Sequence, residues 1–320
     1  MATTPPAEYE VDAVLVRRLL REQHPDLAGL PLRLAGQGWD NLLWRLGKDL
    51  AVRVPRRAIA AQLLEHEQRW LSTLAERLRP LTPVALPVPV RVGRPGAGFP
   101  WPWSVVPWIA GQSAATIGPA QRAGIAESLA AVVAALHVPA PADAPDNPVR
   151  SMPLAGRGEA VRARLESGGV PRSSEVTELW AELSALPRRR GPRTWLHGDL
   201  HPHNLVVTNV GSHSAARGAS ATAETVRLVG VVDFGDMTAG DPSTDLATAW
   251  LTFDVAGRAR FRETLADLAQ DGSAPHYDDA TWQRARGWAL SMATAMTATS
   301  DDEPLIRAIG HHTIDQVLLG

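Results

Sequence analysis

The chain has 320 residues, of which 45% are hydrophobic and 21% charged, and its formal net charge is −2. A chain of this length can bury a substantial core, in one large domain or in two lobes. Proteins that bind a nucleic-acid backbone carry a concentrated basic surface, so this near-neutral charge gives no reason to expect a nucleic-acid partner. The longest basic run, 188–190, is short, and we expect it to be a solvated turn ahead of a strand.

The sequence contains no cysteine, which excludes disulfides and thiolate metal sites. Residues 1–10 have neither the basic start nor the apolar stretch of a signal peptide. No uninterrupted apolar run approaches the ~20 residues that cross a bilayer as a helix. We therefore expect a cytoplasmic protein without a membrane partner.

The first third of the chain is predicted to be rich in strands. Short connections at 36–40 and 47–49 separate three of these strands, and such connections indicate hairpins and an antiparallel sheet. A long segment with leucine and tryptophan at helical spacing follows the third strand. In chain order we expect a helix over 11–22, strands over 32–34, 41–46 and 50–54, a helix over 58–78, an extended proline-rich segment over 80–89 and a strand over 103–109.

The rest of the chain is predicted to be mostly helical. A helix over 119–137 begins with proline, where the missing amide costs nothing. We expect further helix over 159–186, interrupted near 168–169, and again from residue 245 onward. Strands over 205–207 and 226–232 flank a segment rich in Ser, Ala, Gly and Thr at 209–225, which we expect to be a mobile hairpin tip.

The most informative segment is residues 197–204, His-Gly-Asp-Leu-His-Pro-His-Asn, which precedes a short β run. Asp199 and Asn204 are five positions apart, and Asp233 ends an apolar strand and begins Asp-Phe-Gly-Asp. Phosphoryl transfer from a nucleotide requires positioning and charge neutralisation more than covalent help. One carboxylate can orient the attacking hydroxyl, while an amide oxygen and a second carboxylate suit Mg²⁺. The spacing matches the catalytic-loop pattern of kinases.

Together with Ala-Gly-Asp-Pro-Ser-Thr-Asp-Leu-Ala at 239–247, these segments resemble the aminoglycoside phosphotransferase family over nearly the whole chain. The resemblance implies an α+β, bilobal, protein-kinase-like fold with a small antiparallel-sheet N-lobe and a larger, mostly helical C-lobe. We place the nucleotide-binding lobe at 1–109 and the catalytic and acceptor-binding lobe at 110–320. The resemblance also implies that Asp199 is the catalytic base and that Asn204 and Asp233 are Mg²⁺ ligands.

The N-lobe supplies candidate nucleotide-binding residues. Gly36 and Gly38 lie where a glycine-containing loop would cover the phosphates, although an ordinary hairpin turn explains them equally well. Arg53 lies where kinases place a phosphate-contacting lysine, and an arginine there can contact phosphates and pair with a helix carboxylate. Glu65 and Glu67 are both candidates for that carboxylate, and Glu67 fits the family pattern better; the alternative is a solvated helix charge.

The segment after the strand at 103–109 would be the hinge that holds the nucleotide base. Pro107 lacks an amide hydrogen, so we expect Trp108, Ile109 and Ala110 to supply the backbone groups. Trp101 and the other tryptophans are expected to serve mainly as core residues.

Several polar residues near the main motif keep more than one interpretation. His197, His201 and His203 could converge on zinc, but we favour roles in shaping the loop or facing substrate. Asp245 is expected to be structural, as a helix N-cap or a brace of the catalytic loop. The roles of Asp236 and Asp241 stay open, and either could face a cationic acceptor.

We therefore predict a Mg²⁺-dependent phosphotransferase that moves the γ-phosphoryl group of ATP or GTP to a hydroxyl of a small molecule. An aminoglycoside or another antibiotic is one acceptor class, which would make the protein an antibiotic-resistance enzyme. The alternatives are a metabolite kinase of the same fold, acting on choline, homoserine, a sugar or a fructosamine, and a pseudokinase that binds nucleotide without chemistry. A serine hydrolase is poorly supported, because the chain has no Gly-x-Ser-x-Gly motif.

Overall fold

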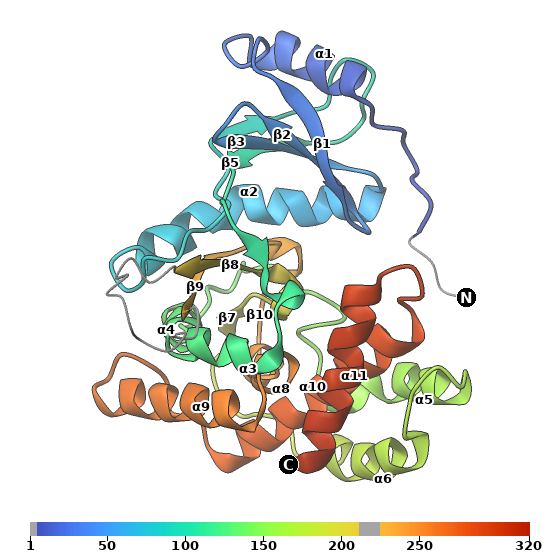
Figure 1. Ribbon diagram of the computed structural model, residues 1–320, viewed down its shortest axis with the longest axis vertical. Helices are drawn as coiled ribbons and strands as arrows, with labels where there is room; N and C mark the ends of the chain where they lie inside the picture. Colours follow the sequence, from blue (N-terminus) through green and yellow to red (C-terminus); the bar gives the residue numbers. More distant parts are fainter. Residues whose placement is uncertain (1–4, 211–224) are drawn as a thin grey trace, which may run out of the picture.

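A computed structural model describes residues 5–210 and 225–320 and shows two lobes (Figure 1). The N-terminal lobe is an antiparallel five-stranded sheet in the order β1-β2-β3-β5-β4, with helix α1 above it and helix α2 below it in the view of Figure 1. Its elements are α1 (Ala13–Gln23), β1 (Leu32–Gln37), β2 (Asn41–Leu46), β3 (Leu50–Pro55), α2 (Ala58–Leu78), β4 (Arg91–Gly93) and β5 (Trp103–Pro107).

The C-terminal lobe is mostly helical and contains two small antiparallel sheets. One sheet pairs β7 with β10, and the other has the order β6-β8-β9. The elements are β6 (Gln112–Ser113), α3 (Pro119–Arg122), α4 (Ala126–Leu136), α5 (Gly158–Glu166), α6 (Ser173–Ser184), β7 (Thr194–Leu196), β8 (Leu205–Val210), β9 (Thr225–Val231), β10 (Thr238–Gly240), α7 (Ser243–Leu246), α8 (Thr248–Thr252), α9 (Val255–Gln270), α10 (Asp279–Ala298) and α11 (Pro304–Leu319).

Alternating burial fixes the orientation of the strands in the N-terminal sheet. In β2 every second side chain is buried, and Leu42, Trp44 and Leu46 enter a cluster closed by α1. Side chains of a strand alternate between its two faces, so Leu43 lies on the opposite face. Leu43 pairs with Arg53 of β3, and Arg53 therefore points from this face toward α2.

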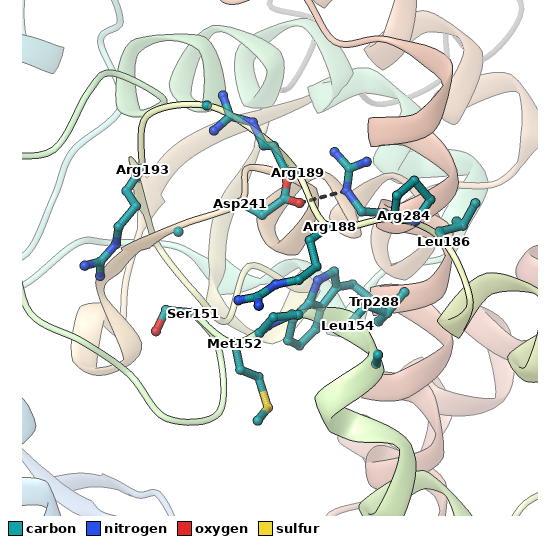
Figure 2. A pocket seen from close by; sticks show the side chains of 15 residues that line it. Ser151, Met152, Leu154, Leu186, Arg188, Arg189, Arg193, Asp241, Arg284 and Trp288 are labelled. Atoms are coloured by element: carbon teal, nitrogen blue, oxygen red, sulfur yellow. Dashed lines mark hydrogen bonds and ion pairs between the residues drawn. The ribbon is translucent and has the colours of Figure 1, made fainter.

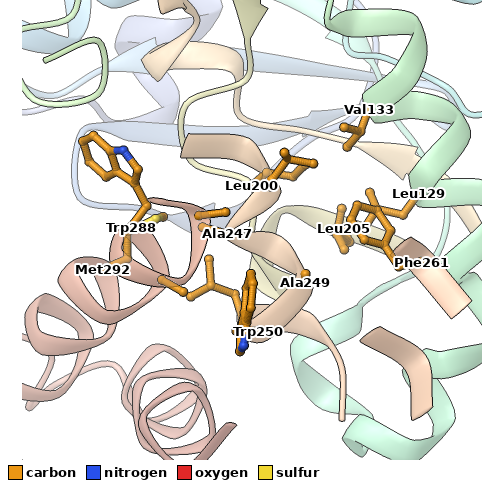
Figure 3. Packing of buried hydrophobic residues seen from close by; sticks show 14 of the residues in the cluster. Leu129, Val133, Leu200, Leu205, Ala247, Ala249, Trp250, Phe261, Trp288 and Met292 are labelled. Carbon is orange, nitrogen blue, oxygen red and sulfur yellow. The ribbon is translucent and has the colours of Figure 1, made fainter. Parts of the chain in front are cut away.

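A continuous hydrophobic core supports the loops that follow β7. Leu200 and Leu205 lie on either side of the turn at 201–204 and are both buried in this core. Figure 3 shows them among Leu129, Ala249 and Phe261 from three different helices. Burying a leucine stabilises a fold by roughly 1.5–3 kcal/mol. These two side chains therefore fix the loop between them, including Asp199 beside Leu200.

The structure confirms the α+β class, the antiparallel N-terminal sheet and the mostly helical C-terminal part. The helix over 58–78 has the predicted bounds. The segment predicted to be extended over 80–89 begins with a turn at 79–81, after which Ala85 bonds to Val229 and Val231 of β9. The predicted helix over 119–137 is wrong as one unit, because a 3-10 turn at Ala123–Ile125 separates α3 from α4.

Short strands were missed because three residues are too few to show a period of two. These strands are β4 and β10, whereas the strand expected after the basic run at 188–190 is present as β7. Most of the predicted hairpin tip, 211–224, lies outside the described residues. Within residues 5–210 and 225–320, no helix is both long and apolar enough to cross a membrane.

Candidate active site

Asp199 lies in the turn that follows β7, and the carboxylate of Asp245 fixes the backbone of this turn. Asp245 accepts hydrogen bonds from the amides of His197, at 2.7 Å, and Gly198, at 2.8 Å. Gly198 has φ of +86°, and a Cβ added there would lie 2.3 Å from the Asp236 carbonyl oxygen, so only glycine fits.

Asp245 itself is completely buried, as expected of a structural brace. The N-cap interpretation is wrong, because Asp245 lies within α7 and its carboxylate serves the amides of another segment. His137 lies 3.3 Å from the same carboxylate. Burial alone would raise the pKa of Asp245, but His137, the charge interaction with His197 and the Gly198 amide lower it, which keeps the group an acceptor.

The carboxylate of Asp199 is held between a cation and an imidazole. Arg150 Nη2 donates to Oδ1 at 2.5 Å, and His201 Nε2 lies 3.1 Å from Oδ2. His201 Nδ1 accepts the amide hydrogen of His203, so its Nε2 carries the proton and donates it to Asp199. Burial opposes ionisation, but Arg150 and His201 outweigh it and hold the pKa of Asp199 well below its usual range.

Arg150 belongs to the site, although the sequence did not indicate it. It follows a proline- and aspartate-rich loop, and its carbonyl accepts a hydrogen bond from Thr244 Oγ1 at 3.2 Å. Its guanidinium also lies 3.9 Å from Asp236 Oδ2, and Asn147 Nδ2 donates to Asp236 Oδ1 at 2.7 Å. Arg150 therefore links two acids of the site, and Asp236 is engaged with groups of the protein itself.

A backbone hydrogen bond links Asn204 to the residue that precedes Asp233. The Val232 amide, next to Asp233, donates to the Asn204 carbonyl at 2.9 Å. Asn204 Nδ2 donates to the Asp199 carbonyl at 2.9 Å, so the amide oxygen is the atom of this side chain suited to a cation. The Asp233 side chain is 54% exposed and accessible.

These two residues fit Mg²⁺. One carboxylate and one amide oxygen form a hard oxygen set, and Mg²⁺ in nucleotide sites takes its remaining ligands from phosphates and water. Among the described residues there is no cluster of three or more histidine or acidic side chains arranged for a metal ion. The histidines of the motif do not support a zinc site, because His197 bonds the Asp199 amide and the Val232 carbonyl and His201 bonds Asp199.

Above this site, Arg53 connects β3 to α2 and to Asp233. Its Nη1 lies 2.7 Å from both carboxylate oxygens of Glu67, and its Nη2 lies 2.6 Å from Asp233 Oδ1. Burial alone would lower the pKa of the Arg53 guanidinium, but the two carboxylates raise it, so the cation persists. Glu67 is 1% exposed, whereas Glu65 faces solvent, and the geometry thus selects Glu67 as the partner of Arg53.

The glycine loop is an ordered hairpin turn. Gly36 lies in β1 opposite Leu43, next to an irregularity in the strand pairing. The Gly38 amide donates to the Asn41 carbonyl at 2.9 Å, and its carbonyl accepts from Arg56 at 3.0 Å. Both polar backbone groups of Gly38 are therefore used by the turn.

The expected hinge joins the lobes between β5 and β6 (Figure 1). The Trp108 amide donates to the Asp49 carbonyl at 2.8 Å, and its ring lies under the Arg45 guanidinium, 4.1 Å from the ring centre. Trp108 thus holds the linker against the sheet in this structure, and its amide is already bonded. Ile109 is half-buried and Ala110 is exposed.

A protein-family model covers most of the chain, including Asp199, Asn204 and Asp233. The model of the phosphotransferase enzyme family (APH) matches residues 31–288, which is most of the chain. The chain belongs to this family. No curated protein matches the chain in sequence. Membership and the site geometry together support a small-molecule phosphotransferase.

Solved structures of low sequence identity share the fold. The GDP complex of wild-type aminoglycoside 2′-phosphotransferase IIIa has a TM-score of 0.64 at 16% identity, covering 97% of this chain and 99% of that chain. The GDP and kanamycin complex of APH(2″)-IIIa has a TM-score of 0.63 at 16% identity, covering 94% and 97%. Macrolide 2′-phosphotransferase MphH from Brachybacterium faecium has 0.57 at 19% identity, covering 95% and 98%.

Proposed function

We propose that this protein transfers the γ-phosphoryl group of ATP or GTP to a hydroxyl group of a small molecule. In this proposal residues 1–109 bind the nucleotide and residues 110–320 carry the catalytic loop and the acceptor site. The observation that supports it best is the position of Asp199, held between Arg150 and His201 and bonded through its carbonyl to Asn204. Solved structures of the same fold contain GDP or ADP.

On the nucleotide side, Arg53 would contact the phosphates while Glu67 holds its guanidinium in place. Gly36, Gly38 and their hairpin would cover the phosphates, and Ile109 and Ala110 would present backbone groups to the base. Asn204 and Asp233 would hold Mg²⁺, which when bound neutralises charge on the triphosphate. Asp233 accepts a hydrogen bond from Arg53 in this structure, so Mg²⁺ and Arg53 would compete for the Asp233 carboxylate.

On the acceptor side, Asp199 would accept a hydrogen bond from the attacking hydroxyl. Each carboxylate oxygen has two lone pairs, and Arg150 and His201 occupy one on each, which leaves room for the substrate. The lowered pKa of Asp199 makes it a weak base. That suits a loose transition state, in which the hydroxyl needs orientation early and loses its proton to the carboxylate late.

The test is a screen of hydroxyl compounds with ATP and GTP, read as a mass gain of one phosphate. Aminoglycosides and macrolides belong in it as antibiotic acceptors, and choline, homoserine, sugars and fructosamines as metabolite acceptors. Phosphorylation that needs Mg²⁺ supports the proposal. Nucleotide binding without transfer to any acceptor and without hydrolysis favours a pseudokinase instead.

A further inference from the structure

A cavity of about 210 Å³ lies between α10 and the segments that flank α5 and α6 (Figure 2). Its wall combines an apolar part with several guanidinium groups. The residues that define it, which we call the arginine cavity, are Met152, Leu154, Trp288, Arg188, Arg189 and Arg284.

The charge balance of the arginine cavity is positive. Arg284 is neutralised by Asp241 at 2.8 Å, and Asp241 is the acidic residue of the lining. Arg193, at the edge of the cavity, pairs with Asp146. The Arg188 side chain has no hydrogen-bond or ion-pair partner among residues 5–210 and 225–320, and Figure 2 shows it projecting toward the middle of the lining residues.

The cavity adjoins the catalytic loop through two segments. Ser151 lines the cavity and follows Arg150, whose guanidinium contacts Asp199. Gly240 also lines the cavity, and it pairs with Thr194 at the far end of the β7–β10 ladder that leads to the catalytic turn. A ligand in the cavity therefore borders the segment that carries Arg150 and the strand pair that leads to Asp199.

The acidic side chains near the cavity and the catalytic turn already have partners. Asp199 binds Arg150 and His201, Asp236 binds Asn147 near Arg150, and Asp241 binds Arg284. A polycationic acceptor would have to displace these partners and would meet the unpaired Arg188. An anionic group would instead gain charge-assisted hydrogen bonds, for which the planar guanidinium is well suited.

Resting on the proposed phosphotransferase function, we propose that the arginine cavity binds an oxyanion group of the acceptor, a phosphate or carboxylate. In this assignment Arg188 contacts the anion, whereas Arg189 adds positive charge to the lining while its guanidinium donates to the Pro192 carbonyl. The apolar part of the acceptor packs on Met152, Leu154 and Trp288, and its hydroxyl extends toward Asp199. The acceptor is thus an anionic hydroxyl compound, in contrast to kanamycin in the complex with APH(2″)-IIIa.

Three probes of similar size and different charge test the binding: phenyl phosphate, benzyl alcohol and benzylamine. Calorimetry with and without a saturating non-hydrolysable Mg-ATP analogue distinguishes binding of a probe in the cavity from binding in the nucleotide site. We expect phenyl phosphate to bind most tightly and Arg188→Ala to weaken it about tenfold, the effect of one lost charge-assisted bond. Arg190→Ala is the matched control, since Arg190 is exposed like Arg188 but does not line the cavity, and it should leave the affinity unchanged.

Three results would each overturn the assignment: no binding of phenyl phosphate, equal effects of Arg188→Ala and Arg190→Ala, or tighter binding of benzylamine than of phenyl phosphate. A second experiment measures transfer to anionic, neutral and cationic hydroxyl compounds. We expect Arg188→Ala to raise the KM of an anionic acceptor about tenfold and to leave the nucleotide KM unchanged. Transfer to aminoglycosides at a KM insensitive to Arg188→Ala would refute the inference but keep the proposed function. Arg188-dependent anion binding without transfer to any compound would refute the proposed function instead.

Discussion

Arg53 Nη2 lies 2.6 Å from Asp233 Oδ1, and this contact joins the N-terminal sheet to the acid that follows β9. The same guanidinium binds both oxygens of the buried Glu67. One side chain therefore connects β3, α2 and the candidate Mg²⁺ ligand. Removing a partner from a buried ion pair is costly, because the remaining charge stays in a medium that solvates it poorly.

Arg53→Ala should destabilise the protein by about 3–5 kcal/mol, because Glu67, whose pKa burial raises to about 7, would be left buried without its ion-pair partner. Urea unfolding measures the change. Arg69→Ala is the control, because Arg69 and Asp143 form an ion pair in which each side chain is 60% exposed. Such surface pairs contribute about 0–1 kcal/mol to the free energy of unfolding. Equal destabilisation by the two substitutions would show that Arg53 and Glu67 do not form a buried pair.

Arg150→Gln should change the pH dependence of stability. Because the pKa of Asp199 is lowered, its carboxylate stabilises the folded state above its ordinary pKa, and this contribution is lost as the pH falls through the lowered value. Without Arg150 the pKa of Asp199 should rise. The wild type should therefore exceed the variant in free energy of unfolding by about 1–3 kcal/mol at pH 7, and by less as the pH falls from 5 to 3.5.

Urea titrations of both proteins at pH 7, 5, 4 and 3.5 give this difference. A difference that grows on acidification would mean that Arg150 does not hold the ionised form of Asp199.

Gly198→Ala should impair both folding and activity. Gly198 has φ of +86°, and the new Cβ would clash with the Asp236 carbonyl at 2.3 Å. Gly168→Ala is the matched control, because φ there is +76° but nothing lies within 4 Å of the added Cβ. The control should lose about 1 kcal/mol from backbone strain alone, whereas Gly198→Ala should lose more and also displace Asp199. Melting temperatures and phosphotransfer rates of the two variants decide this, and equal losses would argue against a sterically fixed turn.

The proximity of Asp199 and Asn204 could be predicted from the sequence, because one short turn between two strands separates them. The preference for Glu67 over Glu65 could also be read from the helical spacing of buried residues in α2. Glu67 lies three and four positions from Leu64 and Leu71 on the buried stripe of α2, and Glu65 does not.

Other parts of the site could not be read from local patterns. Arg150 lies 49 positions from Asp199 in a loop without periodicity, and only the folded chain brings the two together. The run at 188–190 precedes β7 outside any helix or strand and Arg188 is exposed, as expected, but its place beside a cavity depends on the packing of α10 against distant segments. The Trp108 amide looked available to a nucleotide base because its partner, the Asp49 carbonyl, belongs to another strand.

Asp199→Asn tests the central claim most directly. The substitution keeps the shape of the side chain but removes the charge that binds Arg150 and orients a hydroxyl. Phosphate transfer to the acceptor found by the screen is followed by mass spectrometry, and nucleotide binding is measured by calorimetry on the same samples. We predict that transfer falls by about 10²–10⁴-fold or more while nucleotide affinity changes little. Transfer at the wild-type rate by Asp199→Asn would contradict the assignment of Asp199 as the catalytic residue.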